Sequence, residues 1–351
     1  DASRTGAPIF LLELIASLAK RLDVACTILL ASGGELEREF RKLGTTIVLG
    51  NRNELDPLAL NELQQRDIRL VYANTITNGN LQVRLKALGC PIVCHVHELA
   101  YSIQHSFGAH NLRQVLASTD FFLAGSKAVA GYLETLVPKD RVALAYPFID
   151  VQANRQAASR AKPPLDVPQG AVVVGACGTI VWRKGTDLFV QLAQRVIAAT
   201  AKPVVFVWLG GPLDQVEYRN LHHDAQVLGI AERLVFPGAV SAHLPYFAQF
   251  DIFVLPSRED PFPLVMLDAA SLGKPLVCFE HSGGAPEFVE TDAGFVVPYL
   301  DVEAMAADVL RLVENPELRA TLGEGARRKV LERHDLAVGS EQIARSIRGL
   351  L

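Results

Sequence analysis

Short β-branched runs alternate with segments of helical periodicity along the whole chain. This alternation is typical of βαβ units, in which helices connect parallel strands and cover the sheet. It predicts an α/β protein with two doubly wound halves, and the 351-residue length agrees with two domains of roughly 150 residues each. The strands are expected at 25–31, 45–49, 69–73, 91–96 and 121–124 in the first half, and at 171–177, 204–209, 234–236, 252–255, 275–279 and 294–297 in the second.

The segment 152–170 separates the two halves. It holds three prolines and few large apolar side chains, which is typical of a linker. We therefore expect an N-terminal domain of residues 1–155 and a C-terminal domain of residues 156–335. The last helical pattern, at 336–351, is expected to pack back toward the N-terminal domain.

The charge of the chain argues against several classes of partner. The net charge is −4: residues 1–150 carry 15 basic and 15 acidic side chains, and the remainder carries 19 and 23. Neither half has the basic excess of a nucleic-acid-binding protein, so no nucleic-acid partner is expected. No tight Lys/Arg cluster indicates binding to anionic lipid, although a weaker apolar contact with a membrane stays open.

Hydropathy and cysteine usage predict a cytoplasmic protein without a metal. Mean hydropathy is +0.21, but every apolar run is interrupted before about 18 residues. The longest run, 171–182, contains Gly175 and Gly178. The five cysteines form no CxxC pair and fit buried free thiols. The segment CPIVCHVH at 90–97 holds two Cys and two His, but its spacing matches no common zinc pattern.

In doubly wound sheets ligands bind at the carboxyl ends of the strands, so polar residues directly after strands are the candidates. The first candidate is GTIVWRKG at 178–185, before a helix expected to run from Lys184. A lysine in the first helical turn is unfavourable because it faces the positive end of the helix dipole, unless an anion binds there. The alternative is an exposed lysine that points to solvent.

The second candidate is DPFPLVMLD at 260–268. Its prolines fit a helix that starts near Phe262, with Asp260 at the mouth, where a plain N-cap is the alternative. Asp268 has apolar neighbours at helical spacing and therefore needs a partner. The two carboxylates are too far apart for a glycosidase-type pair but could hold two parts of one extended ligand.

Two further loops come after strands. HSGGAPE at 281–287 contains Gly283 and Gly284, which would let the backbone approach a ligand, unless the segment is only a structural turn. His97 and Glu98 come after another strand and are joined by Asn74 after the preceding one. The alternative for His97 is a hydrogen-bonded loop residue.

Together these motifs resemble the retaining nucleotide-sugar glycosyltransferases of family 4. That family has the GT-B architecture, in which two Rossmann-like domains face a cleft. The resemblance covers nearly the whole chain and rests on the order and spacing of the motifs rather than on any one of them. They are TGAP at 5–8, HVHE at 95–98, GTIVWRKG at 178–185, VWLGG at 207–211, LVFPGAV at 234–240, the segment 251–277 and SGGAPEFV at 282–289.

The resemblance implies a role for each matching residue. Lys184 would bind the donor diphosphate. Asp260 and Asp268 occupy the ends of the family's E-x7-E motif, so Asp260 would face the transferred sugar and Asp268 would take the ribose hydroxyls as its partner. His97 would complete the cleft from the N-terminal domain, and that domain would also bind and select the acceptor. The remaining residues implied to bind the donor are Gly6, Arg183, Gly238, Val240, Phe262, Leu264, Gly283 and Gly284.

The implied reaction is transfer, with retention, from a UDP- or GDP-sugar to a glycan or lipid-linked acceptor in polysaccharide biosynthesis. It would need no metal and no other cofactor, in the cytoplasm, with peripheral association at the inner face of the membrane left open. The chain departs from the family in its two aspartates, in Pro263 for glycine and in Thr179 for arginine. The family's first strand would end just before Asp1, so we expect one central strand of the first sheet to be missing. The alternatives are a sugar-nucleotide-binding protein without transferase activity and a sugar-nucleotide epimerase.

Overall fold

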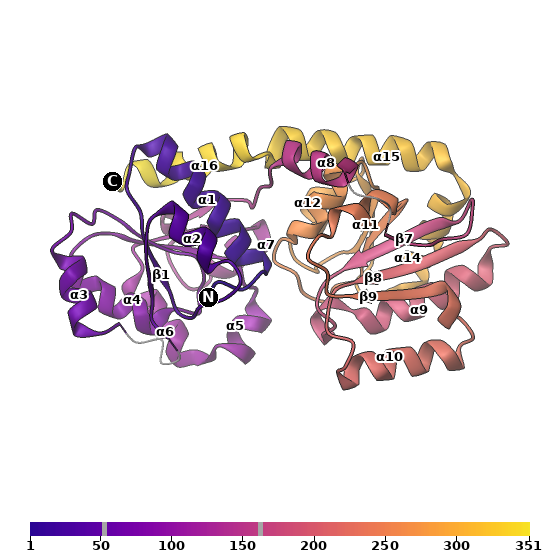
Figure 1. The fold of residues 1–351 in the computed structure, drawn as a ribbon, viewed down its shortest axis with the longest axis horizontal. Coiled ribbons are helices and arrows are strands. Elements are labelled where there is room, and N and C mark those ends of the chain that lie inside the picture. Colours follow the sequence, from indigo (N-terminus) through magenta and orange to yellow (C-terminus); the bar gives the residue numbers. More distant parts are fainter. Residues whose placement is uncertain (51–54, 161–163) are drawn as a thin grey trace. The chain divides into compact units, whose positions relative to one another are not determined.

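The computed structural model describes residues 1–50, 55–160 and 164–351 (Figure 1). The chain divides into two compact units, each built from helices and parallel strands. Unit 1 comprises residues 1–148 together with 336–351, and unit 2 comprises residues 149–335. The division therefore falls seven residues before the boundary expected at 155, because the segment after Phe148 folds as a helix of unit 2.

Unit 2 contains one parallel sheet of six strands in the order β12-β11-β10-β7-β8-β9. All six strands were predicted, and their centre is fully buried, as the apolar runs require. Helices α9 and α14 pack against one face, where Phe189, Phe206 and Val309 are inaccessible to solvent. The strands are β7 (Val172–Cys177), β8 (Val204–Leu209), β9 (Leu234–Gly238), β10 (Ile252–Leu255), β11 (Leu276–Phe279) and β12 (Gly294–Val297).

From β7 to α14 the strands and helices of unit 2 alternate; α8 precedes the first strand, and α15 follows α14 without a strand between them. A single turn of π-helix (Val330–His334) ends the last helix. The helices are α8 (Val151–Arg160), α9 (Thr186–Ala199), α10 (Val216–Val227), α11 (Leu244–Gln249), α12 (Leu264–Ser271), α13 (Ala285–Val289), α14 (Val302–Glu314) and α15 (Pro316–Lys329).

The strand order of unit 2 reverses between β7 and β10. The chain proceeds from β7 through β8 to β9 on one side, and from β10 through β11 to β12 on the other. At such a switch point the loops after the two central strands part and leave a crevice, where open α/β sheets bind ligands. GTIVWRKG comes after β7 and DPFPLVMLD comes after β10, so the topology brings these two motifs to the same place.

Unit 1 holds two separate parallel sheets. One has the order β1-β2 and the other the order β3-β4-β5-β6, with β4 buried at all five positions. Within the described part of unit 1 no strand joins β1 to β3, and the expectation of a missing central strand stays a prediction. The strands are β1 (Thr27–Leu30), β2 (Thr45–Val48), β3 (Val71–Ala73), β4 (Ile92–Val96), β5 (Phe121–Ala124) and β6 (Val142–Leu144), of which β6 was not predicted.

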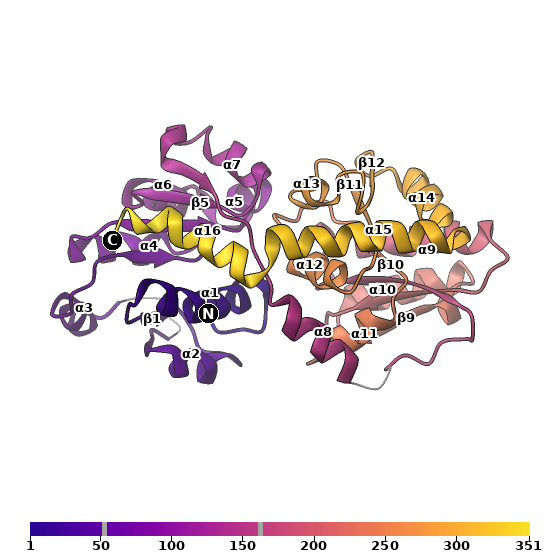
Figure 2. The same ribbon diagram turned by 90° about the horizontal axis from the view of Figure 1, so that it is seen from above.

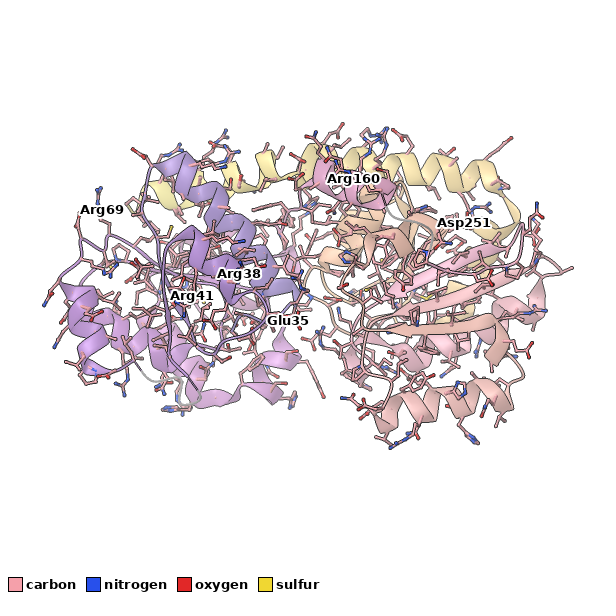
Figure 3. The ribbon with its side chains drawn as sticks, viewed as in Figure 1. Glu35, Arg38, Arg41, Arg69, Arg160 and Asp251 are labelled. Atoms are coloured by element: carbon pink, nitrogen blue, oxygen red, sulfur yellow. The ribbon has the colours of Figure 1, made fainter. Side chains whose placement is uncertain are left out.

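The helices of unit 1 are amphipathic surface helices, as α2 illustrates. Its Phe40 is buried, whereas Arg38 and Arg41 lie on the exposed side (Figure 3). Phe40 therefore anchors the helix on β1 and β2 while the arginines stay hydrated. The helices are α1 (Gly6–Leu22), α2 (Glu37–Leu43), α3 (Pro57–Gln64), α4 (Gly79–Leu85), α5 (Ala100–Ser106), α6 (Gly108–Ser118), α7 (Lys127–Leu133) and α16 (Leu336–Arg348).

The C-terminal helix α16 lies against α1 (Figure 2). Arg21 of α1 donates to Ser340 Oγ at 3.0 Å and to the Ala337 carbonyl at 2.9 Å, and it pairs with Glu341 at 3.0 Å. Gly339 lets α16 approach Phe148 closely, because a Cβ there would lie 2.6 Å from the Cβ of Phe148. The last residues of the chain thus complete the core of unit 1.

The linker prediction for 152–170 is wrong over its first half. Residues 151–160 form α8, and residues 161–163 lie outside the described residues. The helix packs on α11 and α12 and buries Val151, although most of its surface is polar. Polar composition suggested a linker, but one packed face is enough to hold a helix. None of the described helices is long and apolar enough to cross a membrane.

Candidate functional site

The loop after β7 places Lys184 at the switch point of unit 2. Residues 182–184 form a 3-10 turn, and Gly185 adopts a left-handed conformation with φ of 71°. A Cβ at Gly185 would lie 1.9 Å from the Pro256 carbonyl oxygen, so only glycine fits. The expectation that Lys184 lies in the first helical turn is wrong, because Gly185 separates the 3-10 turn from α9, which begins at Thr186.

Lys184 forms an ion pair with Asp260. Both side chains are largely buried, at 13% and 8% exposed. The pair connects the loop after β7 to the loop after β10. Burial strengthens the attraction between the two charges and makes an isolated partner costly.

Asp260 also ties in the loop after β11 through its backbone. Its N–H donates to the Ser282 carbonyl at 2.7 Å, and its own carbonyl accepts from the Gly284 N–H at 3.2 Å. The alternative of an N-cap at Asp260 is wrong, because α12 begins at Leu264 with Pro263 as its extended N-cap residue. Asp260 therefore belongs to a junction of three loops.

Arg183 and Arg258 lock the same two loops together. The Arg183 carbonyl accepts from the backbone N–H groups of Arg258 at 2.8 Å and Glu259 at 3.2 Å. The Arg183 guanidinium donates to the Glu259 carbonyl at 3.4 Å. Arg258 forms a bidentate ion pair with Asp187 and lies 5.1 Å from the centre of the Trp182 ring. These contacts hold the Lys184–Asp260 pair between two stiff segments.

The glycines after β11 are required by packing. A Cβ at Gly284 would lie 2.3 Å from Cδ2 of Phe262 and 2.4 Å from the Pro261 carbonyl oxygen. Gly283 has a φ of 124°, which side chains other than glycine rarely adopt. Phe262 itself is buried and its ring lies 5.1 Å from that of His334. Packing against Phe262 and Pro261 therefore requires a glycine at position 284, and the role of this segment in donor binding stays a prediction.

Asp268 finds two partners within unit 2. Its Oδ1 accepts from Nδ2 of Asn154 at 2.6 Å, and its Oδ2 lies 2.8 Å from Nε2 of His243. The partner that its apolar neighbours demand is thus supplied inside the chain, so a ligand hydroxyl is not required for that purpose. Each carboxylate oxygen retains a further lone pair that can accept a hydrogen bond.

Sequence reasoning missed both partners of Asp268. Asn154 lay in the predicted linker, and His243 stands alone before a Leu-Pro helix start. No spacing relates either residue to Asp268, because α8, the loop after β9 and α12 meet only through the tertiary packing. No pattern in the sequence could have indicated them.

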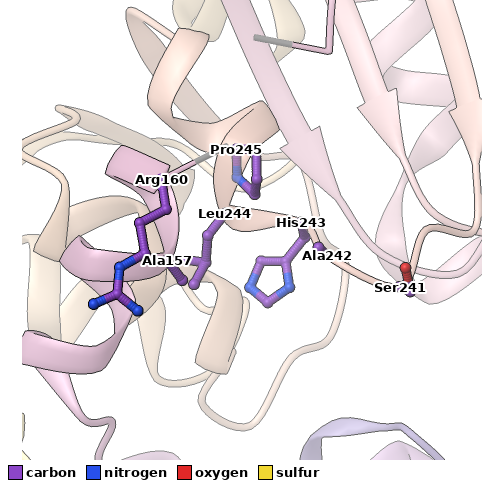
Figure 4. A pocket seen from close by; sticks show the side chains of 7 residues that line it. All are labelled: Ala157, Arg160, Ser241, Ala242, His243, Leu244 and Pro245. Atoms are coloured by element: carbon purple, nitrogen blue, oxygen red, sulfur yellow. The ribbon is translucent and has the colours of Figure 1, made fainter. Parts of the chain in front are cut away.

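A hollow of about 390 Å³ adjoins His243 (Figure 4). Arg160 of α8 and Leu244 of α11 are among the residues that line it. Gly238, with φ of 77°, ends β9, and Val240 leads from it into the segment 241–245 that lines the hollow. Gly238 and Val240, two of the residues implied to bind the donor, therefore precede His243, the partner of Asp268, in one continuous loop.

His97 of unit 1 is held by the turn that opens α1. Its Nε2 lies 3.1 Å from Oδ1 of Asn74, whose Nδ2 donates to the Ala7 carbonyl at 2.9 Å. Gly6, the first residue of α1, precedes Ala7. Burial lowers the pKa of His97 to about 4, so its ring is neutral at neutral pH. The structure thus brings Gly6 and His97 together through Asn74.

His95 is a second buried histidine that sequence reasoning used only as a possible metal ligand. Its Nδ1 lies 2.6 Å from the Tyr72 hydroxyl and its Nε2 lies 2.9 Å from the Ala145 carbonyl oxygen. Burial holds the pKa of His95 well below its usual range. Since a carbonyl only accepts, Nε2 carries the proton and Nδ1 accepts from Tyr72.

The cysteine and histidine residues of CPIVCHVH do not converge on a metal. Cys94 donates its thiol proton to the Thr75 carbonyl at 3.5 Å, and both ring nitrogens of His95 are engaged. Among the residues that the structure describes, no group of three or more His, Cys, Asp or Glu side chains could hold a metal ion.

Two Rossmann-like units with a polar junction at the switch point of the second define the GT-B class of fold. The chain matches solved structures of that class, among them HepE from Anabaena in complex with UDP and glucose. The TM-score is 0.84 at 21% identity, over 99% of this chain and 97% of that one.

The chain belongs to the glycosyltransferases of family 4, also described as group 1. Residues 4–153 match the model "Glycosyltransferase Family 4", and residues 171–315 match "Glycosyl transferases group 1". The two matches cover the cores of the two units.

Curated relatives match part of the chain. The lipopolysaccharide core biosynthesis glycosyltransferase LpsE of Rhizobium meliloti is 33% identical over 168 residues, 48% of this chain and 46% of LpsE. The D-inositol 3-phosphate glycosyltransferase of Saccharomonospora viridis is 30% identical over 227 residues, 61% of this chain and 52% of that protein. The chain spans about half the length of these curated relatives.

Proposed function

We propose that this protein transfers a sugar from a nucleoside diphosphate sugar to a glycan or lipid-linked acceptor, with retention at the anomeric carbon. The observation that carries the proposal is the buried Lys184–Asp260 pair at the switch point of unit 2. It combines a cation suited to a diphosphate with a carboxylate suited to sugar hydroxyls. The structural neighbour HepE, which was solved in complex with UDP and glucose, supports this class of donor.

Lys184 would stabilise the leaving diphosphate. A lysine ammonium has three N–H donors, so one bond to Asp260 leaves donors for phosphate oxygens. The N-terminus of α9 starts two residues later and adds backbone N–H groups and a favourable dipole. Negative charge that develops on the leaving group would be neutralised by groups already in place, and no metal ion is needed in this scheme.

Asp260 and Asp268 would hold two parts of the donor. Asp260 lies at the junction of three loops and would accept hydrogen bonds from hydroxyls of the transferred sugar. Asp268 keeps one free lone pair on each oxygen beyond its bonds to Asn154 and His243, and would accept from the ribose hydroxyls. Each aspartate is one C–C bond shorter than the family's glutamate, so the surrounding loops must bring the carboxylates closer.

We expect Asp268→Asn to weaken UDP binding by about tenfold, since an amide offers one acceptor oxygen where the carboxylate offers two. Titration calorimetry with UDP and the unfolding temperature without ligand are the measurements. Glu303→Gln, a matched change at an exposed carboxylate of α14 in unit 2, is the control. An unchanged Kd in a folded Asp268→Asn protein would contradict the ribose assignment.

The first test of the proposal is a thermal-shift panel with UDP, GDP, ADP, dTDP and CDP. A nucleotide at 100 times its Kd adds about 2.7 kcal/mol to the free energy of unfolding, which corresponds to a rise of several degrees. One stabilising nucleotide is the expected result, and its sugars are then tested for transfer in the presence and absence of EDTA. If the protein binds a nucleotide but releases no nucleotide from any donor sugar, the result favours a sugar-nucleotide-binding protein without transferase activity. Conversion of the donor sugar without an acceptor would favour an epimerase.

A further inference from the structure

The side chain of Asn74 is oriented by a backbone group, which makes its role toward His97 unambiguous. A carbonyl oxygen only accepts hydrogen bonds, so the amide nitrogen of Asn74 must face Ala7, 2.9 Å away. Its Oδ1 therefore faces Nε2 of His97, 3.1 Å away. That oxygen also only accepts, so Nε2 of His97 must carry a proton.

His97 holds a single ring proton at neutral pH, because burial lowers its pKa to about 4. With that proton on Nε2, the other ring nitrogen, Nδ1, is a bare acceptor. Within residues 1–50, 55–160 and 164–351, no hydrogen bond to Nδ1 is formed. Residue 125 beside it is a glycine: a Cβ there would lie 3.4 Å from Nδ1, so no side chain of this residue covers the nitrogen.

The ring of His97 is also fixed in its plane. Phe10 of α1 packs edge-on with ring centres 5.2 Å apart, and the His95 ring lies 4.1 Å away. The backbone N–H of His97 donates to Glu98 at 3.0 Å. A half-turn of the ring about Cβ–Cγ would put Cε1 in the place of Nε2 and would lose the bond to Asn74.

We propose that Asn74 is a positioning residue that selects the Nε2-protonated form of His97, so that His97 presents an acceptor and not a donor to the substrate. The ligand group that this site recognises is then a hydroxyl that donates its proton to Nδ1, as on a hexose. This inference rests on the proposed function, because it takes His97 to contact the sugar. Nδ1 is then the atom of His97 that accepts the hydrogen bond, and Asn74 is the residue that keeps the proton on Nε2.

The test reads the protonation state directly, by NMR of the histidine ring nitrogens in the free protein. The wild type is expected to show a protonated Nε2 and a bare Nδ1 at His97. Asn74→Ala removes the acceptor and is expected to populate the other form. Asn74→Asp restores an acceptor and is expected to restore the Nε2 proton, while its charge raises the pKa of His97.

A matched control is Asn111→Ala. Asn111 also bonds backbone groups in unit 1, at Gly79 and Ile76, but it does not bond His97. Its variant should leave the His97 signals unchanged. A bare Nε2 in the wild type, or an unchanged His97 spectrum in folded Asn74→Ala, would overturn the inference.

Kinetics separate this inference from the proposed function. With the donor identified by the nucleotide panel, Asn74→Ala should lower kcat/KM by about tenfold, the loss expected for one substrate hydrogen bond. A changed tautomer with unchanged kcat/KM would overturn the proposal that Asn74 acts on the substrate through His97. If the wild type binds no nucleotide and transfers no sugar, the proposed function fails, and the NMR result alone then decides the tautomer assignment.

Discussion

Lys184→Ala should lower kcat/KM for sugar transfer by a factor on the order of 100 or more, which corresponds to about 3 kcal/mol of transition-state stabilisation. The leaving diphosphate gains charge as the sugar departs, and Lys184 is the cation held at the switch point by its pair with Asp260. Because this stabilisation grows in the transition state, kcat should fall as well as donor affinity. Steady-state kinetics with the donor identified by the nucleotide panel is the measurement.

Loss of stability in Lys184→Ala must be separated from loss of catalysis. Removal of Lys184 leaves Asp260 buried without its cation, and breaking a buried pair costs about 3 to 5 kcal/mol of stability. Rates are therefore referred to the folded fraction, measured by unfolding in urea. Lys202→Ala is the matched control, since Lys202 pairs with Glu314 on the surface of the same unit. Activity of folded Lys184→Ala within threefold of the wild type would remove Lys184 from the mechanism.

Acidification should destabilise unit 1 between about pH 6.5 and pH 4. Burial lowers the pKa of His97 from 6.5 to about 4, and lowers that of His95 as well. In this window the unfolded chain binds protons that the folded chain excludes, so the free energy of unfolding falls as the pH falls. The full shift of His97 corresponds to about 3 kcal/mol.

Glu98 works in the opposite direction and must be separated from the histidines. Burial raises its pKa, so the folded state takes up a proton at Glu98 before the unfolded state does. Urea unfolding at pH values from 7.5 to 4, compared between wild type and His97→Gln, isolates the histidine. The variant should lose a large part of the dependence on pH. An identical dependence in both proteins would show that His97 is not excluded from protonation by the fold.

Much of the fold could be predicted from local patterns. Each predicted strand of unit 2 is present. The four inner strands β7, β8, β10 and β11 bury both faces, which is why they read as continuous apolar, β-branched runs between turns. Strand β6, which has three residues, was not predicted. Helix α8 was missed because its stability comes from packing on α11 and α12 rather than from its composition.

The candidate site divides in the same way. From the alternation, GTIVWRKG and DPFPLVMLD could be placed at the carboxyl ends of strands. That they meet at one switch point depends on the order of the strands in the sheet, which only the structure gives. The conformation of each loop could not be predicted from the sequence. Gly185 ends the turn before α9 because of a carbonyl oxygen at Pro256, which is 71 residues away in the chain.

The sequence by itself therefore determined the class of fold, which depends on the periodicity of the apolar residues. It also identified Lys184, Asp260 and His97 as candidates, because they lie in the loops that follow strands. Only the tertiary structure decided which side chains form hydrogen bonds and ion pairs with the candidate residues. Asp268 is held by Asn154 and His243, and His97 by Asn74. Hydrogen bonds join atoms within about 3 Å whatever their separation in the chain, and no local pattern records which distant segments packing will bring that close.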